Sequence, residues 1–184
     1  MNANSYNCYI YGNLAFSPNY LAIAQSSSYP VIKVIAIKDL SNEDGFVKPN
    51  QDKPQDKPIL EMGFISDIKY VQLNGTWTLI VCSNSNIFSF SEDGQNMSKM
   101  SMNDAAEPIP DQAIMYTGIA AQGNLLYIGD STGTVTRFEV SSGGQVNKDN
   151  IKSRLTVASL PNPVTCLEIQ LANLYVGTDN GILH

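Results

Sequence analysis

The sequence GIAAQGNLLYIGDSTGTV at residues 118–135 returns in altered form as CLEIQLANLYVGTDNGIL at residues 166–183, after a shift of 48 residues. Identical or similar residues then coincide at five positions: Leu126 with Leu174, Tyr127 with Tyr175, Ile128 with Val176, Gly129 with Gly177, and Gly133 with Gly181. Self-similarity at a fixed interval is the sequence sign of a repeat architecture.

Two weaker copies of the same unit precede these stretches. Residues 79–88 have the sequence LIVCSNSNIF, and Leu79 lies 47 residues before Leu126. Residues 21–34 form the other copy, with Leu21 placed 58 residues before Leu79. Four-stranded repeats of about 40–45 residues are typical of the blades of WD40 propellers. The sequence therefore predicts an all-β fold, a WD40-like β-propeller of about four blades.

Each unit combines a short strand with a tight turn. Residues 125–128 and 174–176 carry apolar side chains on both faces, as a strand between neighbouring sheets should. The DSTG and TDNG segments that follow are rich in turn residues, and their glycine can adopt positive φ. We therefore expect the two apolar segments to be central strands of two neighbouring blades.

The repeat divides the chain into approximate blade units at residues 1–58, 59–110, 111–160 and 161–184, all within one propeller segment. Residues 48–58, KPNQDKPQDKP, contain no hydrophobic residue and are expected to form a solvated insertion without a strand. A seven-bladed ring needs about 300 residues at 40–45 per blade. The length therefore predicts a partial propeller whose exposed edge must be capped or paired.

The composition argues against several kinds of chemistry. The 11 Lys and Arg against 17 Asp and Glu give a net charge of −6 without any basic stretch, so nucleic acid is not an expected partner. The single histidine is the last residue, His184, which argues against a catalytic triad. Cys8, Cys82 and Cys166 are more than 70 residues apart and lack metal-ligand spacing. We therefore expect no catalytic residue, no cofactor and no metal site.

The amino-terminal sequence MNANSYNCYIYG has neither the basic flank nor the apolar run of a signal peptide. No stretch approaches 18 consecutive apolar residues, so no membrane insertion is expected. The three cysteines are interpreted as reduced thiols of an intracellular protein. The expected location is the cytoplasm.

Residues 118–138 and 163–181, with Gly129 at the end of a strand and Gly133 and Gly181 at the turns, resemble WD-repeat propellers. The Trp-Asp and Gly-His pairs of that family are absent, and the single tryptophan, Trp77, precedes a strand in a weaker copy. The resemblance implies a non-enzymatic, cytosolic propeller. A ciliary assembly is a further expectation for a propeller of this kind.

Residues 130–136, DSTGTVT, also match the phosphorylation loop of P-type ATPases, Asp-Lys-Thr-Gly-Thr-apolar-Thr, at six of seven positions. The lysine of that loop is missing here. A blade turn explains in addition the parallel TDNG at residues 178–181, which phosphoryl transfer does not. We therefore interpret the segment as a turn.

The expected function is a scaffold for protein–protein interactions. The loops that join the second and third strands of each blade should gather on one rim, where partners bind. The candidate partner-binding residues on these loops are Asn84, Asp130, Ser131, Asp179 and Asn180. An open blade edge is a further docking place. Two alternatives stay open: a small propeller hydrolase that uses a carboxylate pair, and a half-propeller completed by another chain.

Overall fold

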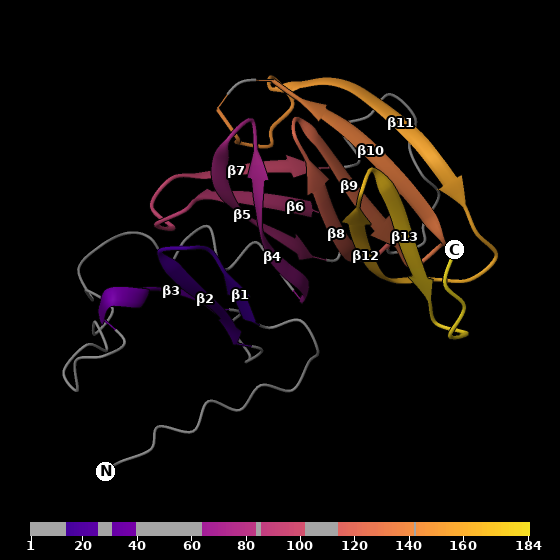
Figure 1. The fold of residues 1–184 in the computed structure, drawn as a ribbon, viewed down its shortest axis with the longest axis horizontal. Helices are drawn as coiled ribbons and strands as arrows, with labels where there is room; N and C mark the ends of the chain where they lie inside the picture. Colours follow the sequence, from indigo (N-terminus) through magenta and orange to yellow (C-terminus); the bar gives the residue numbers. More distant parts are fainter. Residues whose placement is uncertain (1–13, 26–30, 40–63, 84–85, 102–113, 142) are drawn as a thin grey trace, which may run out of the picture.

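The computed structural model describes residues 14–25, 31–39, 64–83, 86–101, 114–141 and 143–184. These residues form four antiparallel β-sheets and one short 3₁₀ helix, η1 (Ile37–Asp39). The expectation for residues 48–58 lies outside the described residues. Figure 1 shows the four sheets following one another from the amino-terminal to the carboxyl-terminal part of the chain.

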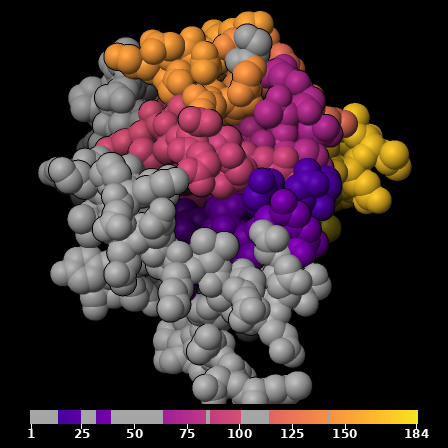
Figure 2. All heavy atoms as spheres, turned by 90° about the vertical axis from the view of Figure 1, so that its left-hand side faces the viewer, coloured from indigo at the N-terminus to yellow at the C-terminus, as the bar shows by residue number. Residues whose placement is uncertain are grey.

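The first two sheets come from the amino-terminal half. The first is β1 (Leu14–Phe16), β2 (Tyr20–Gln25) and β3 (Val31–Ala36). The second is β4 (Ile65–Leu73), β5 (Thr76–Ser83), β6 (Asn86–Ser91) and β7 (Met97–Ser101). In both sheets, consecutive strands are neighbours. Figure 2 shows the atoms of the first sheet lying directly against those of the second.

The other two sheets come from the carboxyl-terminal half. The third is β8 (Tyr116–Gln122), β9 (Leu125–Asp130), β10 (Thr134–Val140) and β11 (Ile151–Ser159). The fourth has two strands, β12 (Val164–Gln170) and β13 (Asn173–Thr178). The predicted strands at 125–128 and 174–176 are confirmed and belong to successive sheets; β9 is a central strand as expected, whereas β13 is one of the two strands of its sheet. Beyond β13, a bridge joins Gly177 to Leu183.

Consecutive sheets pack face to face through three apolar clusters. The first cluster joins β1–β3 to β4–β7 around Ala22, Leu79 and Phe88. The second joins β4–β7 to β8–β11 around Ile80, Leu126 and other fully buried side chains. A smaller third cluster joins β8–β11 to β12–β13. This arrangement of successive antiparallel sheets with cores between their faces is a β-propeller with four blades.

The first strands of the sheets lie side by side, because β4 contacts both β1 and β8, and β8 contacts β12. Three of them carry an irregularity at the same place: the pairing with the second strand shifts register around Ser66 in β4, Thr117 in β8 and Thr165 in β12. A bulge of this kind re-aims the side chain of the extra residue. The bulges in β4 and β8 therefore place a hydroxyl residue at the boundary with the next sheet.

These hydroxyl groups link one blade to the next. The Ser66 hydroxyl donates a hydrogen bond to the carbonyl of Tyr116 in the following sheet. The Thr117 hydroxyl donates in the same way to the carbonyl of Val164. We call these two bonds the hydroxyl latches. Thr165, the third residue of the series, is exposed and has no such bond to the described residues.

Candidate functional site

The predicted rim begins at the turn between β9 and β10. Asp130 is buried, and its Oδ1 accepts hydrogen bonds from the amides of Thr132 at 2.8 Å and Thr134 at 3.1 Å. The Thr132 hydroxyl donates to the same oxygen at 2.6 Å. Asp130 thus closes its own turn, and the polar groups that face solvent here belong to its neighbours Ser131 and Thr132.

The turn after β13 has a related construction. The Thr178 hydroxyl donates to Oδ1 of Asn180 at 2.6 Å, and this oxygen also accepts the amide of Ile182 at 3.2 Å. Asp179 and Asn180 are exposed. The predicted positive φ at the turn glycines is confirmed, with 85° at Gly133 and 77° at Gly181.

The segment at residues 160–163 brings the two turns to one rim. The Leu160 amide donates to the Gly133 carbonyl at 2.9 Å. On the other side, Nδ2 of Asn180 donates to Oδ1 of Asn162 at 3.0 Å, and the Asp179 amide donates to the Pro163 carbonyl at 3.0 Å.

The strand that enters the third sheet also reaches this rim. The Met115 amide donates to the Ser131 hydroxyl oxygen at 3.1 Å. The structure therefore places four of the five predicted residues, Asp130, Ser131, Asp179 and Asn180, along one rim. The fifth, Asn84, lies outside the described residues.

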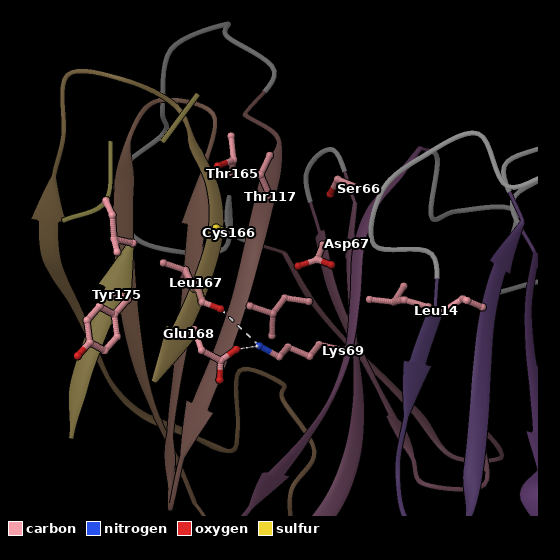
Figure 3. A pocket seen from close by; sticks show the side chains of 13 residues that line it. Leu14, Ser66, Asp67, Lys69, Thr117, Thr165, Cys166, Leu167, Glu168 and Tyr175 are labelled. Carbon is pink, nitrogen blue, oxygen red and sulfur yellow. Dashed lines mark hydrogen bonds and ion pairs between the residues drawn. The ribbon is translucent and has the colours of Figure 1, made fainter. Parts of the chain in front are cut away.

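A second feature lies at the first strands, where a cavity of about 560 Å³ opens between β1, β4, β8 and β12. Figure 3 shows Asp67 and Lys69 of β4 facing Leu167 and Glu168 of β12, with Leu14 of β1 on the opposite side. The lining combines apolar side chains with a few hydroxyl and charged groups. Six of the 13 lining residues are serine, threonine or charged residues, so the wall is mixed in character.

The two carboxyl groups of this cavity are in different electrostatic situations. Glu168 forms an ion pair with Lys69, with 2.8 Å between Oε2 and Nζ. Asp67 has no ion pair within 4 Å among the described residues. Burial raises the pKa of Asp67 to about 7, although hydrogen bonds from the backbone amides of Ile68 and Ile119 and the positive charge of Lys69 act in the opposite direction.

The cysteines in the described part of the chain are also of two kinds. Cys82 of β5 is buried opposite Asp67 of β4, and its burial raises the pKa of the thiol, with the charge of Asp67 adding to the effect. Cys166 is exposed and lines the cavity. Within the described ranges there is no cluster of three or more residues able to hold a metal ion, and no helix there has the length and apolar character needed to cross a bilayer.

Asp67 is not among the residues predicted from the sequence. The register of the first two strands makes Ile68, Ile119 and Leu167 equivalent, so Asp67 corresponds to Gly118 and Cys166 in the next two blades. At this position of the first strand, one blade therefore has a charged residue, Asp67, where the next two blades have uncharged residues. Comparing repeats strand by strand could reveal this signal. An alignment with a constant shift of 47 residues does not place Asp67 opposite Gly118. The reason is that the β4–β5 hairpin is longer than the β8–β9 hairpin.

Comparisons with known proteins support the fold. The chain matches no protein-family model and no curated protein. It superimposes on the computationally designed Ika4 protein with a TM-score of 0.57 and 13% identity, over 97% of this chain and 91% of that one. The designed Ika8 protein gives a TM-score of 0.53 and 11% identity, over 94% of this chain and 44% of Ika8.

BamB from Moraxella catarrhalis is also similar, with a TM-score of 0.50 and 17% identity, over 95% of this chain and 43% of BamB. The designed proteins are β-propellers and BamB is propeller-like. At these identities, the similarity shows the fold alone. The chain spans less than half the length of Ika8 and of BamB.

Proposed function

We propose that this chain is a non-enzymatic, WD-repeat-like scaffold that binds other proteins within an intracellular assembly, in the cytoplasm and more specifically in a cilium. The propeller fold and the sequence resemblance to WD-repeat proteins support this proposal. Within that family, the resemblance is most specific to the amino-terminal half of WD repeat-containing protein 54.

The observation that carries the proposal is the continuous rim formed by residues 130–133, 160–163 and 178–181. Backbone and side-chain hydrogen bonds join these three segments, so their exposed groups have fixed relative positions. Loops held at both ends by a rigid sheet are common places for partner binding. Asp179 and Asn180 are the exposed side chains that a partner would contact first.

A pull-down at low salt with the 184-residue chain as bait, read by mass spectrometry, tests the proposal. Asp179→Ala combined with Asn180→Ala should remove specifically bound proteins. The control is Asp149→Ala, because Asp149 is also exposed and lies in the β10–β11 loop, at the other end of β10 from the rim. Partners that bind all three proteins equally would contradict a rim-based scaffold.

A half-propeller completed by another chain is the second candidate function. The observation in its favour is the two-stranded fourth sheet, which leaves part of β11 uncovered. Leu155 and Val157 of β11 are 51% and 40% exposed, and Leu183 beside β13 is 66% exposed. Exposed apolar side chains on an uncovered strand are available for contact with a second chain. The double variant Leu155→Ser, Val157→Ser should then abolish the association of two chains that is measured by sedimentation. The rim variant Asp179→Ala, Asn180→Ala should leave this association unchanged.

The hydrolase alternative requires two carboxyl groups acting together. Asp67 and Glu168 share the cavity, but Glu168 is engaged by Lys69. This pairing favours the non-enzymatic proposal. Hydrolysis of p-nitrophenyl esters or glycosides that is lost in Asp67→Asn would replace the proposal with the hydrolase.

A further inference from the structure

We propose that the cavity between β1, β4, β8 and β12 binds an aliphatic cation, the side chain of a lysine or arginine carried by a partner protein, with the carboxylate of Asp67 as its counter-ion. This site lies at the first strands of the blades and is separate from the rim. It therefore goes beyond the scaffold function proposed above, and either proposal can fail without the other.

The charges of the cavity favour a cation. Lys69 is already used, because its Nζ lies 2.8 Å from Oε2 of Glu168 and 3.4 Å from the Leu167 carbonyl. Asp67 is left without an ion pair among the described residues. When all three groups are ionised, the cavity carries one net negative charge. A single positive charge would balance it.

The walls of the cavity suit an aliphatic stem. Leu14, Ile68, Ile119, Leu167 and Leu183 line it together with Tyr175. Lysine and arginine side chains bury their methylene groups against apolar surface while the charged end meets a polar group. The volume of about 560 Å³ lies within the usual range of ligand pockets, roughly 300–1,000 Å³.

Burial of Asp67 links the binding to pH. Its raised pKa, about 7, shows that the ionised form is poorly solvated, and a bound cation would stabilise that form. Binding should therefore strengthen as the pH rises from 6 to 8. The other charged or titratable groups around Asp67 are Lys69 of β4, Cys82 of β5, Cys166 and Glu168 of β12, and Tyr175 of β13. Asp67→Asn isolates the contribution of Asp67 from theirs.

The first experiment is a titration followed by amide chemical shifts in NMR spectra. The probe is the peptide acetyl-Gly-Lys-Gly-amide, its uncharged control is the same peptide with an acetylated lysine side chain, and cadaverine represents a free amine. We expect the lysine peptide to shift the amides of Ile68, Ile119 and Tyr175, and to bind at least tenfold more tightly than the acetylated peptide. Asp67→Asn should weaken binding about tenfold and remove its pH dependence, while Asp149→Asn in the β10–β11 loop should leave both unchanged.

A second variant tests the site without changing Asp67. Leu183 lines the cavity and is 66% exposed, so Leu183→Arg supplies a competing cation at its mouth. The control is Ile182→Arg, because Ile182 is also exposed, at 49%, and does not line the cavity. Only Leu183→Arg should weaken binding of the lysine peptide.

The stability of Asp67→Asn provides the folding control. A folded-state pKa raised above the unfolded value means that the folded protein binds more protons between about pH 4 and 7. The wild type should therefore lose stability as the pH rises through this window, and Asp67→Asn should lose less. A variant that melts cooperatively at pH 8 is folded and valid for the binding test.

Three results would overturn the proposal: equal binding of the charged and acetylated peptides, unchanged binding in folded Asp67→Asn, or shifts confined to residues 178–181. Tighter binding of cadaverine than of the peptide would show that a free amine, and not a protein side chain, is the ligand. Loss of rim partners in the pull-down does not affect these outcomes, so failure of the two proposals is distinguishable.

Discussion

The sheets β8–β11 and β12–β13 carry the clearest copies of the repeat, yet the same residues meet different surroundings in each. Leu126 of β9 is completely buried, while its counterpart Leu174 of β13 is partly buried. Strand β9 is paired on both edges, with β8 and β10. Strand β13 is paired with β12 and, through one bridge, with Leu183. The burial of a repeated residue is therefore set by its neighbours and not by the repeat sequence itself.

The same contrast holds across the faces of the two sheets. Sheet β8–β11 has an apolar cluster on each face, one shared with β4–β7 and one with β12–β13. Sheet β12–β13 contributes to the second of these clusters only. Within the described part of the chain, the third sheet is thus an internal blade, and the fourth has one covered face. Equivalent substitutions in the two sheets measure this difference.

The largest difference is expected for the equivalent leucines. Leu126→Ala should lower the free energy of unfolding by about 4 kcal/mol, because a fully buried leucine loses its contacts and leaves a cavity. Leu174→Ala should cost about 1 kcal/mol, since the site is partly solvated already. Urea unfolding followed by circular dichroism measures both. Equal losses would show that the two sheets are equally enclosed in solution.

The next difference concerns the turn glycines. Both Gly133 and Gly181 have positive φ, which costs a non-glycine residue about 1–2 kcal/mol. At Gly133, a Cβ atom would in addition lie 2.2 Å from the Leu160 carbonyl oxygen, while at Gly181 nothing lies within 4 Å. Gly133→Ala should therefore cost about 3 kcal/mol and Gly181→Ala about 1 kcal/mol. Comparison of their melting temperatures is the measurement.

The matched turn experiment also tests the rim. Gly133→Ala should disturb the contact with residues 160–163 and so weaken partner binding, whereas Gly181→Ala should leave the Leu160 bond to the third-sheet turn intact. A Gly133→Ala protein with unchanged stability would mean that residues 160–163 move away at little cost. The rim would then lack the rigidity on which the proposed function depends.

Much of this architecture could be predicted from the sequence because it depends on local patterns. The apolar segments of the four copies correspond to β2, β5, β9 and β13, each the second strand of its sheet. The turn glycines were predicted for the same reason, since positive φ is a property of single residues. Strand β11 was not predicted, because most of its residues are exposed and its sequence therefore has no apolar periodicity.

The cavity and the hydroxyl latches depend instead on contacts between blades. No local sequence pattern distinguishes Asp67. It becomes a candidate binding residue because β4, β8 and β12 bring it opposite Leu167 and Glu168 in the cavity. Ser66 and Thr117 likewise gain a role only when the bulges place them beside the next strand. Their positions follow from register and packing, which a repeat interval alone does not define.

The smallest expected difference concerns these latches. Thr117→Val keeps the shape of the side chain but removes the hydrogen bond to the Val164 carbonyl, which should cost about 1 kcal/mol. Thr165→Val should change stability by less than about 0.5 kcal/mol, because the exposed hydroxyl has no bond to the described residues. Chemical denaturation at several protein concentrations measures both changes.

The dependence on protein concentration also tests whether another chain pairs with the fourth sheet. If another chain completes the propeller, Thr165 should donate to that chain as Thr117 donates to Val164, and Thr165→Val should then weaken association while leaving the dilute protein as stable as the wild type. Thr165→Ser, which retains the hydroxyl, should associate normally. If Thr165→Val destabilises the dilute protein as much as Thr117→Val does, the hydroxyl already has a partner within the chain, and the fourth sheet is not the open end of the series.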